Sequence, residues 1–361
     1  MTAVITDPVA TGRGQFHPLT VARVDRLCPD AAAITFDVGR ELAEVFDFRP
    51  GQSLTVRRFV HGREERRSYS ICAAAGTALR IGVREVAGGA LSGWLVHEVR
   101  PGDVVDAQAP SGSFTPDLDS PARHVLIAAG SGITPVLSIA TSLLARPDHQ
   151  VTLLYGNRRA DTVMFADEVA DLKDTAPQRV QVVHVLSREA QEVQLFNGRL
   201  DGDKLRALLP IVCDVRTVDH WWLCGPFGLV TDAKDVLTGF GVEPGRIHRE
   251  LFYVEPAPPA VHEHAEADLT GAELTVISDG RSTTTTVEPG VPLLDAAQRV
   301  RPDLPFACRG GVCGTCRARV VSGEVTMRRN FALEDDELAD GFVLTCQSLA
   351  CTPEVTVDYD A

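Results

Sequence analysis

The amino-acid sequence predicts a multidomain protein of the β and α/β classes, because three parts of the chain carry different patterns. Short β-branched segments separated by Gly and Pro fill the first third, which is typical of an antiparallel barrel. In the middle third, apolar strands alternate with helix-like segments, which indicates a parallel sheet. The last quarter combines a hairpin, one helix and a cysteine-rich loop, which together predict a compact α+β domain.

We expect the barrel at residues 16–119 and the parallel-sheet domain at residues 120–254. The barrel has β-branched segments such as Leu19–Val24, Ser53–Val56 and Leu79–Val83, with Pro-Gly turn signals at 49–52 and 100–103. The strands expected in the parallel sheet are His124–Ala129, Val151–Tyr155, Val180–Val185 and His220–Cys224. Ligands of such sheets bind beyond the carboxyl ends of the strands, so these ends are where a site is expected.

A linker at residues 255–269 should separate this part from a third domain at residues 270–361. The linker is rich in Pro, Ala and acidic residues and lacks what a core needs. Its two histidines, His262 and His264, have no further ligands nearby in the sequence, so a solvated pair is the simpler interpretation than a metal site. Beyond it, a hairpin turn is expected at Ser278–Arg281 and a helix at Pro292–Val300.

Composition limits the class of protein. Hydrophobic residues make up 44% and charged residues 23% of the 361 positions, as in ordinary globular proteins. No apolar run approaches the roughly 20 residues of a membrane span, and the first residues lack the pattern of a signal peptide. We therefore expect no membrane partner and a cytoplasmic location, where a reducing environment suits nine cysteines.

The net charge of -14 argues against a nucleic-acid partner, which would need a basic face. From Glu255 onwards there are 18 acidic and 8 basic residues. An acidic C-terminal domain fits either electrostatic steering towards a basic partner or simple solubility. The run Glu334–Glu337 is a candidate docking patch, although acidic residues also favour the start of a helix.

Four cysteines give the most specific signal. Cys308, Cys313, Cys316 and Cys346 have the spacing C-x4-C-x2-C with a distant fourth cysteine, which is the ligand set of a plant-type [2Fe-2S] cluster. Glycines at 310, 311 and 314 would let the loop wrap closely around it. A zinc knuckle would need a second C-x2-C hook, and a disulfide framework suits small secreted domains. A Rieske centre is excluded, because no histidine follows His264.

Two short stretches of the barrel could hold a flavin. In Arg67-Ser68-Tyr69-Ser70, Arg67 offers a cation for phosphate, Tyr69 a flat ring and Ser70 a hydroxyl for the redox-active edge. Residues of these types are also common on strand surfaces. The stretch from Gly88 through Gly89 to Ser92 could start a helix whose free backbone N–H groups bind a pyrophosphate.

The parallel sheet carries a glycine-rich turn between a strand and a helix, Gly130-Ser-Gly132-Ile-Thr134-Pro135. Such a turn lets backbone amides approach a phosphate, although this one lacks the third glycine of the usual dinucleotide fingerprint and could be a plain tight turn. After later strands come Arg158, Ser187-Arg188 and Cys224-Gly225. The arginines could bind the extra phosphate of NADP or be merely solvated, and Cys224 could be an ordinary buried residue or contact a nicotinamide ring.

The order of these motifs resembles the ferredoxin-NADP reductase superfamily with a C-terminal plant-type ferredoxin domain. Within it, the stretches Leu153–Arg158, His184–Glu189 and Leu195–Asp201 are most similar to the reductase subunits of phenylacetyl-CoA epoxidases, although reductases of steroid and aromatic-ring hydroxylases share the domain order. The resemblance implies FAD at Arg67, Tyr69, Ser70 and Ser92, and NADPH across Gly130–Pro135 with Ser187 and Arg188. It also implies that Cys224 and Glu250 lie near the hydride-transfer site and that Phe252 covers the flavin.

The expected function is therefore electron transfer from NADPH through FAD and the [2Fe-2S] cluster to a separate oxygenase. A flavin accepts a hydride and releases single electrons, which an oxygenase metal centre requires. The chain has no 2-His-1-carboxylate or Glu-x-x-His pattern of its own for activating oxygen. Two alternatives remain open, an NADH-dependent reductase of a steroid or aromatic-ring hydroxylase and a redox carrier or sensor without turnover.

Overall fold

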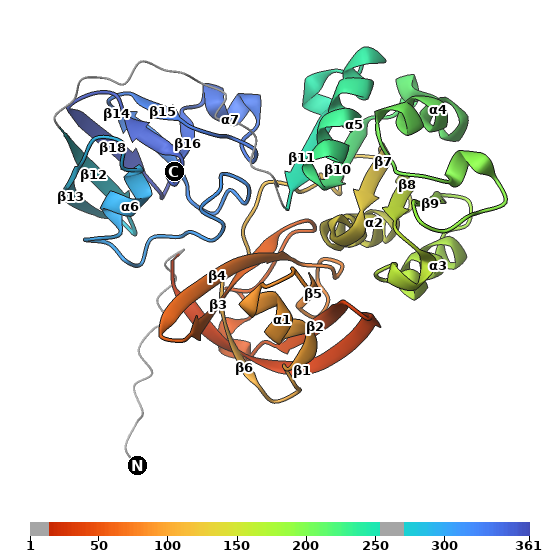
Figure 1. Cartoon of the computed structure of the whole chain (residues 1–361), viewed down its shortest axis with the longest axis horizontal. Helices are drawn as coiled ribbons and strands as arrows, with labels where there is room; N and C mark the ends of the chain where they lie inside the picture. Colours follow the sequence, from red (N-terminus) through yellow and green to blue (C-terminus); the bar gives the residue numbers. More distant parts are fainter. Residues whose placement is uncertain (1–13, 253–270) are drawn as a thin grey trace.

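The computed structural model describes residues 14–252 and 271–361, which form three domains (Figure 1). The order is an antiparallel barrel, a parallel sheet covered by helices and a C-terminal α+β domain, so the predicted fold class is confirmed. The predicted linker at 255–269, with His262 and His264, lies outside the described residues. No helix in the described ranges is long and apolar enough to cross a membrane.

The barrel is a six-stranded antiparallel sheet in the order β4-β3-β6-β1-β2-β5. An isolated bridge between Ile71 and Ile81 joins the end of β4 to β5 and closes the sheet on itself. Alternate residues such as Leu19 and Val21 fill the interior, as period-2 patterning requires. The elements are β1 Phe16–Cys28, β2 Ala31–Asp37, η1 Arg40–Leu42, β3 Ser53–Val60, β4 Arg63–Ser70, β5 Arg80–Arg84, α1 Ala90–His97 and β6 Val104–Gln108.

The second domain is a five-stranded parallel sheet in the order β11-β10-β7-β8-β9. Helices α2 and α3 cover one face and α4 and α5 the other, each with its own apolar core. The strand order reverses at β7, so the turn at Gly130 lies at the point where such sheets bind ligands. The strands are β7 Arg123–Ala129, β8 Gln150–Asn157, β9 Val180–Leu186, β10 His220–Gly225 and β11 Ile247–Leu251. The helices are α2 Ile133–Leu144, α3 Ala166–Thr175, α4 Gly202–Val212 and α5 Phe227–Gly239, with short 3-10 turns η2 Gly130–Gly132, η3 Ala160–Thr162, η4 Gln194–Phe196, η5 Val215–Thr217 and η6 Pro244–Arg246.

The C-terminal domain is a five-stranded sheet in the order β13-β12-β18-β14-β16 beside a two-stranded sheet of β15 and β17. The predicted hairpin turn is present, with Asp279 and Gly280 both at positive φ. The predicted helix at 292–300 is shorter, because regular α-helix ends at Ala297. The elements are β12 Ala272–Ser278, β13 Arg281–Val287, α6 Leu293–Ala297, β14 Arg317–Ser322, β15 Val325–Met327, α7 Asp335–Ala339, β16 Phe342–Leu344, β17 Ser348–Ala350 and β18 Glu354–Asp358.

The three domains meet at one junction. Barrel residues Ala31 and Phe114 belong to the same apolar core as helix α2 of the second domain. The C-terminal domain contacts the second domain through an edge-to-face pair of Phe331 and Phe227, whose ring centroids are 5.5 Å apart. It contacts the barrel through Arg66, whose guanidinium lies 4.0 Å from the ring centroid of Phe306. Side chains from all three domains can therefore take part in a common site.

Candidate functional site

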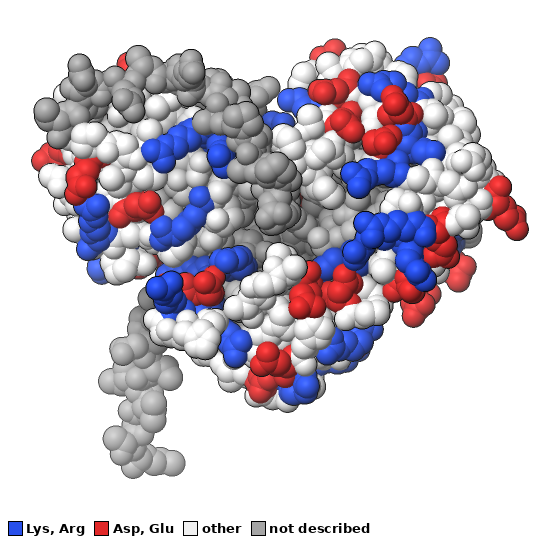
Figure 2. Space-filling view, in the orientation of Figure 1, with Lys and Arg blue, Asp and Glu red and all other residues white. Residues whose placement is uncertain are grey.

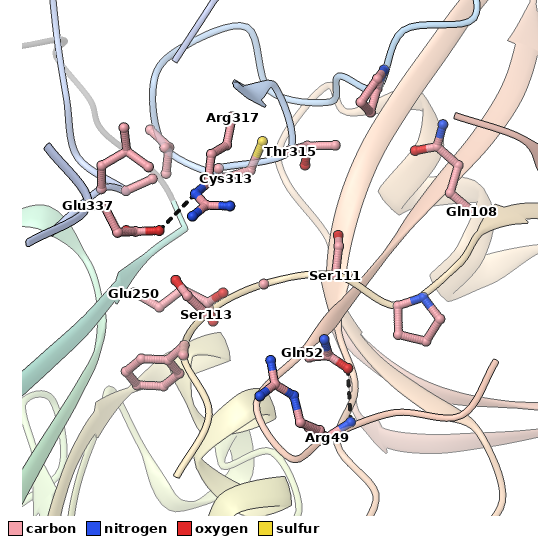
Figure 3. A pocket seen from close by; sticks show the side chains of 18 of the residues that line it. Arg49, Gln52, Gln108, Ser111, Ser113, Glu250, Cys313, Thr315, Arg317 and Glu337 are labelled. Atoms are coloured by element: carbon pink, nitrogen blue, oxygen red, sulfur yellow. Dashed lines mark hydrogen bonds and ion pairs between the residues drawn. The ribbon is translucent and has the colours of Figure 1, made fainter. Parts of the chain in front are cut away.

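A cavity of about 390 Å³ lies at this junction (Figure 3). The barrel contributes Arg49, Gln52 and the loop from Ser111 to Phe114. The second domain contributes Arg249 and Glu250 from β11, and the cysteine loop contributes residues 313–315. In Figure 3, Glu250 lies beside Ser113, with Cys313 and Thr315 on the far side of the cavity. The cavity therefore lies between the barrel, the predicted nicotinamide domain and the predicted cluster loop.

Glu250, Cys224 and Ser70 come together here, although they lie on different elements. Glu250 on β11 stands opposite Cys224 on β10 in the parallel register. The Ser70 hydroxyl donates to Glu250 Oε2 over 3.4 Å. Burial raises the pKa of Glu250 to about 8, and the bond from Ser70 offsets part of that rise. Burial and then the neighbouring Glu250 raise the pKa of Cys224, so both acids are neutral at pH 7.

Strand β4 divides the Arg67–Ser70 motif between its two faces. The partly buried Tyr69 packs against the barrel core, whereas the Ser68 hydroxyl lies 3.3 Å from the Thr315 hydroxyl in the cysteine loop. Arg67 is half-exposed and forms an ion pair with Glu65 at 2.9 Å. Ser68, predicted as part of a flavin motif, thus contacts the C-terminal domain.

Helix α1 begins after Gly89, as the predicted pyrophosphate site requires. The Ser92 hydroxyl accepts from Val86 N at 3.1 Å and donates to Gly89 O at 3.2 Å, so it closes the turn before the helix. The backbone N–H groups of the first helical turn have no partner within the helix and are suited to an anion.

The turn after β7 is packed so closely that it needs glycine. A Cβ at Gly132 would lie 2.1 Å from the carbonyl oxygen of Cys224, and Gly130 has a φ of +56°. Thr134 donates to Ser131 O at 3.0 Å, which shapes the start of the helix that contains Pro135. Arg84 of β5 was not among the predicted residues, yet its guanidinium would lie 3.1 Å from a Cβ at Gly130. The sequence feature that could have identified Arg84 is its position as a basic residue at the end of a strand.

Arg158, Ser187 and Arg188 also converge, at the carboxyl ends of β8 and β9. Arg188 N donates to Arg158 O at 2.8 Å. The Arg158 guanidinium donates to Asp30 of the barrel at 3.1 Å, so its charge is already paired. Gly225 ends β10, and the partly buried Phe252 packs against the core that the barrel shares with the second domain.

The four cysteines predicted as cluster ligands lie together as two pairs, Cys308 with Cys313 and Cys316 with Cys346. Gly310 N and Val312 N donate to Cys308 Sγ at 3.3 and 3.4 Å. Left-handed backbone at Arg309, Gly311 and Gly314 bends the loop around the sulfur atoms. In the described ranges no three side chains converge on a single metal ion, whereas a [2Fe-2S] cluster takes two thiolates per iron.

The residues thus fit FAD and the cluster. When bound, FAD would supply the conversion of a hydride into single electrons and the cluster would relay them. This chain supplies neutral Glu250 and Cys224, a hydroxyl from Ser70 and backbone donors to the thiolates.

Comparisons with known proteins agree with this site. Three family models match, the oxidoreductase FAD-binding domain at residues 18–115, the oxidoreductase NAD-binding domain at 126–235 and the 2Fe-2S iron-sulfur cluster binding domain at 276–351. The chain is 41% identical to one of the subunits of the 1,2-phenylacetyl-CoA epoxidase of Escherichia coli K12, over 96% of this chain and 98% of that protein. It is 35% identical to the ferredoxin reductase component of 3-ketosteroid-9-alpha-monooxygenase of Mycobacterium tuberculosis H37Rv, over 87% and 86%.

A solved structure of phthalate dioxygenase reductase shares the fold, with a TM-score of 0.57 at 24% identity, over 95% of this chain and 98% of that one. With FAD-binding, NAD-binding and cluster-binding domains in one chain, the protein is an NAD(P)H-dependent flavin iron-sulfur oxidoreductase. The chain therefore belongs to the ferredoxin-NADP reductase-like reductases that carry a C-terminal plant-type [2Fe-2S] ferredoxin domain.

Proposed function

We propose that this reductase takes its electrons from NADPH and passes them to the separate oxygenase of a phenylacetyl-CoA epoxidase. We infer the electron acceptor from the 41% identity to a subunit of such an epoxidase along nearly the whole of both chains. Support for NADPH comes from Ser187 and Arg188, which sit beside Arg158 at the carboxyl edge of the sheet, where a ribose phosphate would bind.

The residue roles are part of this proposal. Arg67 and the backbone at Gly89–Ser92 hold the flavin phosphates, while Tyr69 packs on the ring. Ser70, Cys224 and Glu250 surround the site of hydride transfer, and Phe252 covers the flavin. The turn at Gly130–Pro135 with Gly225 binds the nicotinamide dinucleotide. Cys308, Cys313, Cys316 and Cys346 bind the cluster. The domain limits are 16–119, 120–254 and 270–361, and nine unpaired cysteines suit work in the cytoplasm.

Titration tests the proposal directly. Anaerobic NADPH should bleach both the flavin and the cluster of the purified protein. NADPH oxidation should then rise when the oxygenase component of the epoxidase and phenylacetyl-CoA are added together. If NADPH reduces the protein but no such coupling is seen, the proposed acceptor is wrong, whereas the NADPH-dependent reductase activity is not contradicted.

Replacing Arg188 by Ala tests the choice of nucleotide. We expect kcat/KM for NADPH to fall about tenfold to a hundredfold, because a charge-assisted bond to phosphate is lost. The value for NADH should change little, and the exposed Arg206→Ala variant serves as the control. Equal losses with both nucleotides would mean that Arg188 does not recognise the phosphate.

Two contacts favour NADH, the nucleotide of a second candidate function, an NADH-dependent reductase of a steroid or aromatic-ring hydroxylase. Asp30 already pairs with Arg158, and Glu189 accepts from Ala160 N at 2.8 Å in the same region. Two carboxylates there would disfavour a ribose phosphate. A clear preference of the wild-type protein for NADH would support this candidate.

A further inference from the structure

The cluster loop has two ends with different surroundings. Cys313 lines the junction cavity together with Glu250 of the second domain. Cys308, at the other end of the loop, is exposed to solvent. An electron acceptor that is a separate protein can approach the cluster most closely at the exposed end.

Four arginines lie on this loop or on the segments that pack beside it, and we call Arg299, Arg309, Arg328 and Arg329 the cluster rim. Arg309 reaches helix α6, where it pairs with Asp295 at 2.6 Å. Arg328 donates to Gly290 O at 2.7 Å, and its backbone N–H donates to Gln347 O beside the loop. The carbonyl of Arg329 lies against Gly311, and Arg299 pairs with Glu288 at 3.2 Å.

The rim is basic on a domain that is acidic overall. Residues 271–361 hold fourteen acidic residues and eight arginines, yet the rim has four arginines against two paired carboxylates. Among the described residues, Arg328 and Arg329 have no carboxylate partner. Figure 2 shows basic and acidic side chains next to one another along the junction between this domain and the barrel.

Two residues of the acidic run at 334–337, the candidate docking patch, face inward, whereas Asp336 is exposed. Glu337 is 15% exposed and pairs with Arg317 at 2.9 Å, as Figure 3 also shows. Burial raises the pKa of Glu334, and Arg249 of β11 partly offsets this, which places the carboxylate against the second domain. These two carboxylates therefore serve contacts within the molecule and are not free to steer a partner.

We propose that the separate electron acceptor docks on the cluster rim through an acidic surface and receives electrons at the Cys308 end of the loop. This rests on the proposed function only in requiring an external protein acceptor. Charge complementarity is the argument, because an arginine-rich face at the exit of electrons attracts carboxylates. The partner's docking surface should accordingly be rich in Asp and Glu.

Two haem proteins of opposite charge serve as probes, acidic cytochrome b5 and basic cytochrome c. In each case one electron leaves the reduced cluster and converts ferric haem iron to ferrous iron, with no bond made or broken. For Arg299→Glu/Arg328→Glu at low salt, kcat/KM with cytochrome b5 should fall about tenfold, because steering is reversed. With cytochrome c it should stay equal or rise. Both differences should shrink at high salt.

Binding without turnover provides an independent measurement. Calorimetric titration of the oxidised reductase with oxidised cytochrome b5 should give a weaker Kd for the double variant. Arg206→Glu on helix α4, an exposed arginine of the second domain, is the matched control and should change neither rate nor Kd. Uncharged benzoquinone should be reduced at the wild-type rate by all variants.

The outcomes distinguish docking on the cluster rim from a role of these arginines in stabilising the cluster, and both from a failure of the proposed function. An unchanged rate and Kd with cytochrome b5 would overturn the docking proposal. Equal slowing with both cytochromes, together with a lower midpoint potential, would also overturn it and would assign the arginines to stabilising the anionic cluster. A wild-type protein that reduces no benzoquinone with NADPH would instead contradict the proposed function.

Discussion

The two ends of the parallel sheet use polar residues in opposite ways. At the carboxyl end, Glu250, which stands opposite Cys224 on the neighbouring strand, lines the junction cavity. At the amino end, buried rings bond to one another. His149 Nε2–H donates to Leu118 O at 3.1 Å, His124 Nε2–H to His149 Nδ1 at 3.2 Å, and Trp222 Nε1–H to His124 Nδ1 at 3.2 Å.

This chain of bonds fixes neutral tautomers for His124 and His149. Burial, followed by the neighbouring His220, lowers the pKa of His124 to about 3 and that of His248 to about 4. His220 and His248 add a further contact of 3.2 Å between ring nitrogens. The comparison teaches that a polar cluster whose groups already pair with one another supports the fold, whereas one that lines a cavity is available to a ligand.

The most damaging change should be Gly132→Ala at the carboxyl end. The added Cβ would meet the Cys224 carbonyl at 2.1 Å, so the turn must move, and a displacement near 1 Å can cost about a hundredfold in kcat/KM for NADPH. Gly239→Ala at the end of α5, where a Cβ has open space, is the control. A fully active Gly132→Ala variant with an unchanged melting temperature would show that the close packing of this turn at the carboxyl end is not needed for activity.

Glu250→Gln should have a smaller effect that depends on pH. Because the folded-state pKa is raised to about 8, the wild-type carboxyl is neutral below that pH and should lose activity as it ionises above it. The amide stays neutral, so the pH profile of flavin reduction should flatten. The rate at pH 7 should fall about tenfold, the equivalent of one hydrogen bond. An unchanged profile would show that another group titrates.

The same substitution has a stability consequence. The Glu250 pKa is higher in the folded than in the unfolded state, so its contribution to stability is lost as pH rises from about 4.5 through about 8. Glu250→Gln should therefore increase the free energy of unfolding more at pH 8 than at pH 5, as urea denaturation would reveal.

At the amino end of the sheet, lowering the pH should reduce the free energy of unfolding. His124 and His248 have lowered folded-state pKa values, so their contribution is present above about 6.5 and is lost as pH falls towards 3 or 4. Each should reduce the free energy of unfolding by about 1.4 kcal/mol per pH unit in that window. Urea denaturation between pH 7 and 4.5 measures the slope, which His124→Asn should make shallower and Gly132→Ala should not.

Ser68→Ala should have the smallest effect. It removes the 3.3 Å contact between the Ser68 and Thr315 hydroxyls at the junction, which is worth about 1 kcal/mol or less. Thermal unfolding should shift by a few degrees at most. A large loss of flavin would instead show that Ser68 helps to bind the flavin.

The sequence predicted what depends on local spacing. Cysteine spacing predicted a cluster-binding domain, which the family model at 276–351 supports, and the strand predicted at His124–Ala129 is β7, Arg123–Ala129. Glycines in a turn need a local backbone shape, which their neighbours reveal. The predicted helix at 292–300 was too long, because apolar spacing does not mark the turn that follows Ala297.

What the sequence could not predict depends on register between distant strands. His220 stands opposite His124 and Trp222 opposite His248 only because β10 lies between β7 and β11. The burial of Glu250 and the inward orientation of Glu334 likewise follow from how the domains pack. Such contacts join residues that are far apart in the chain, and no spacing rule connects them.

Strand β18, Glu354–Asp358, lies between β12 and β14 in the ferredoxin domain, and the Tyr359 hydroxyl lies 2.7 Å from the Thr345 hydroxyl, next to the proposed ligand Cys346. The sheet that frames the thiols thus cannot close until residue 358 has left the ribosome exit tunnel. Iron delivery must then follow synthesis of this whole region. In a cell short of iron-sulfur assembly factors, the yellow form that holds only flavin should accumulate before the brown form that also holds the cluster.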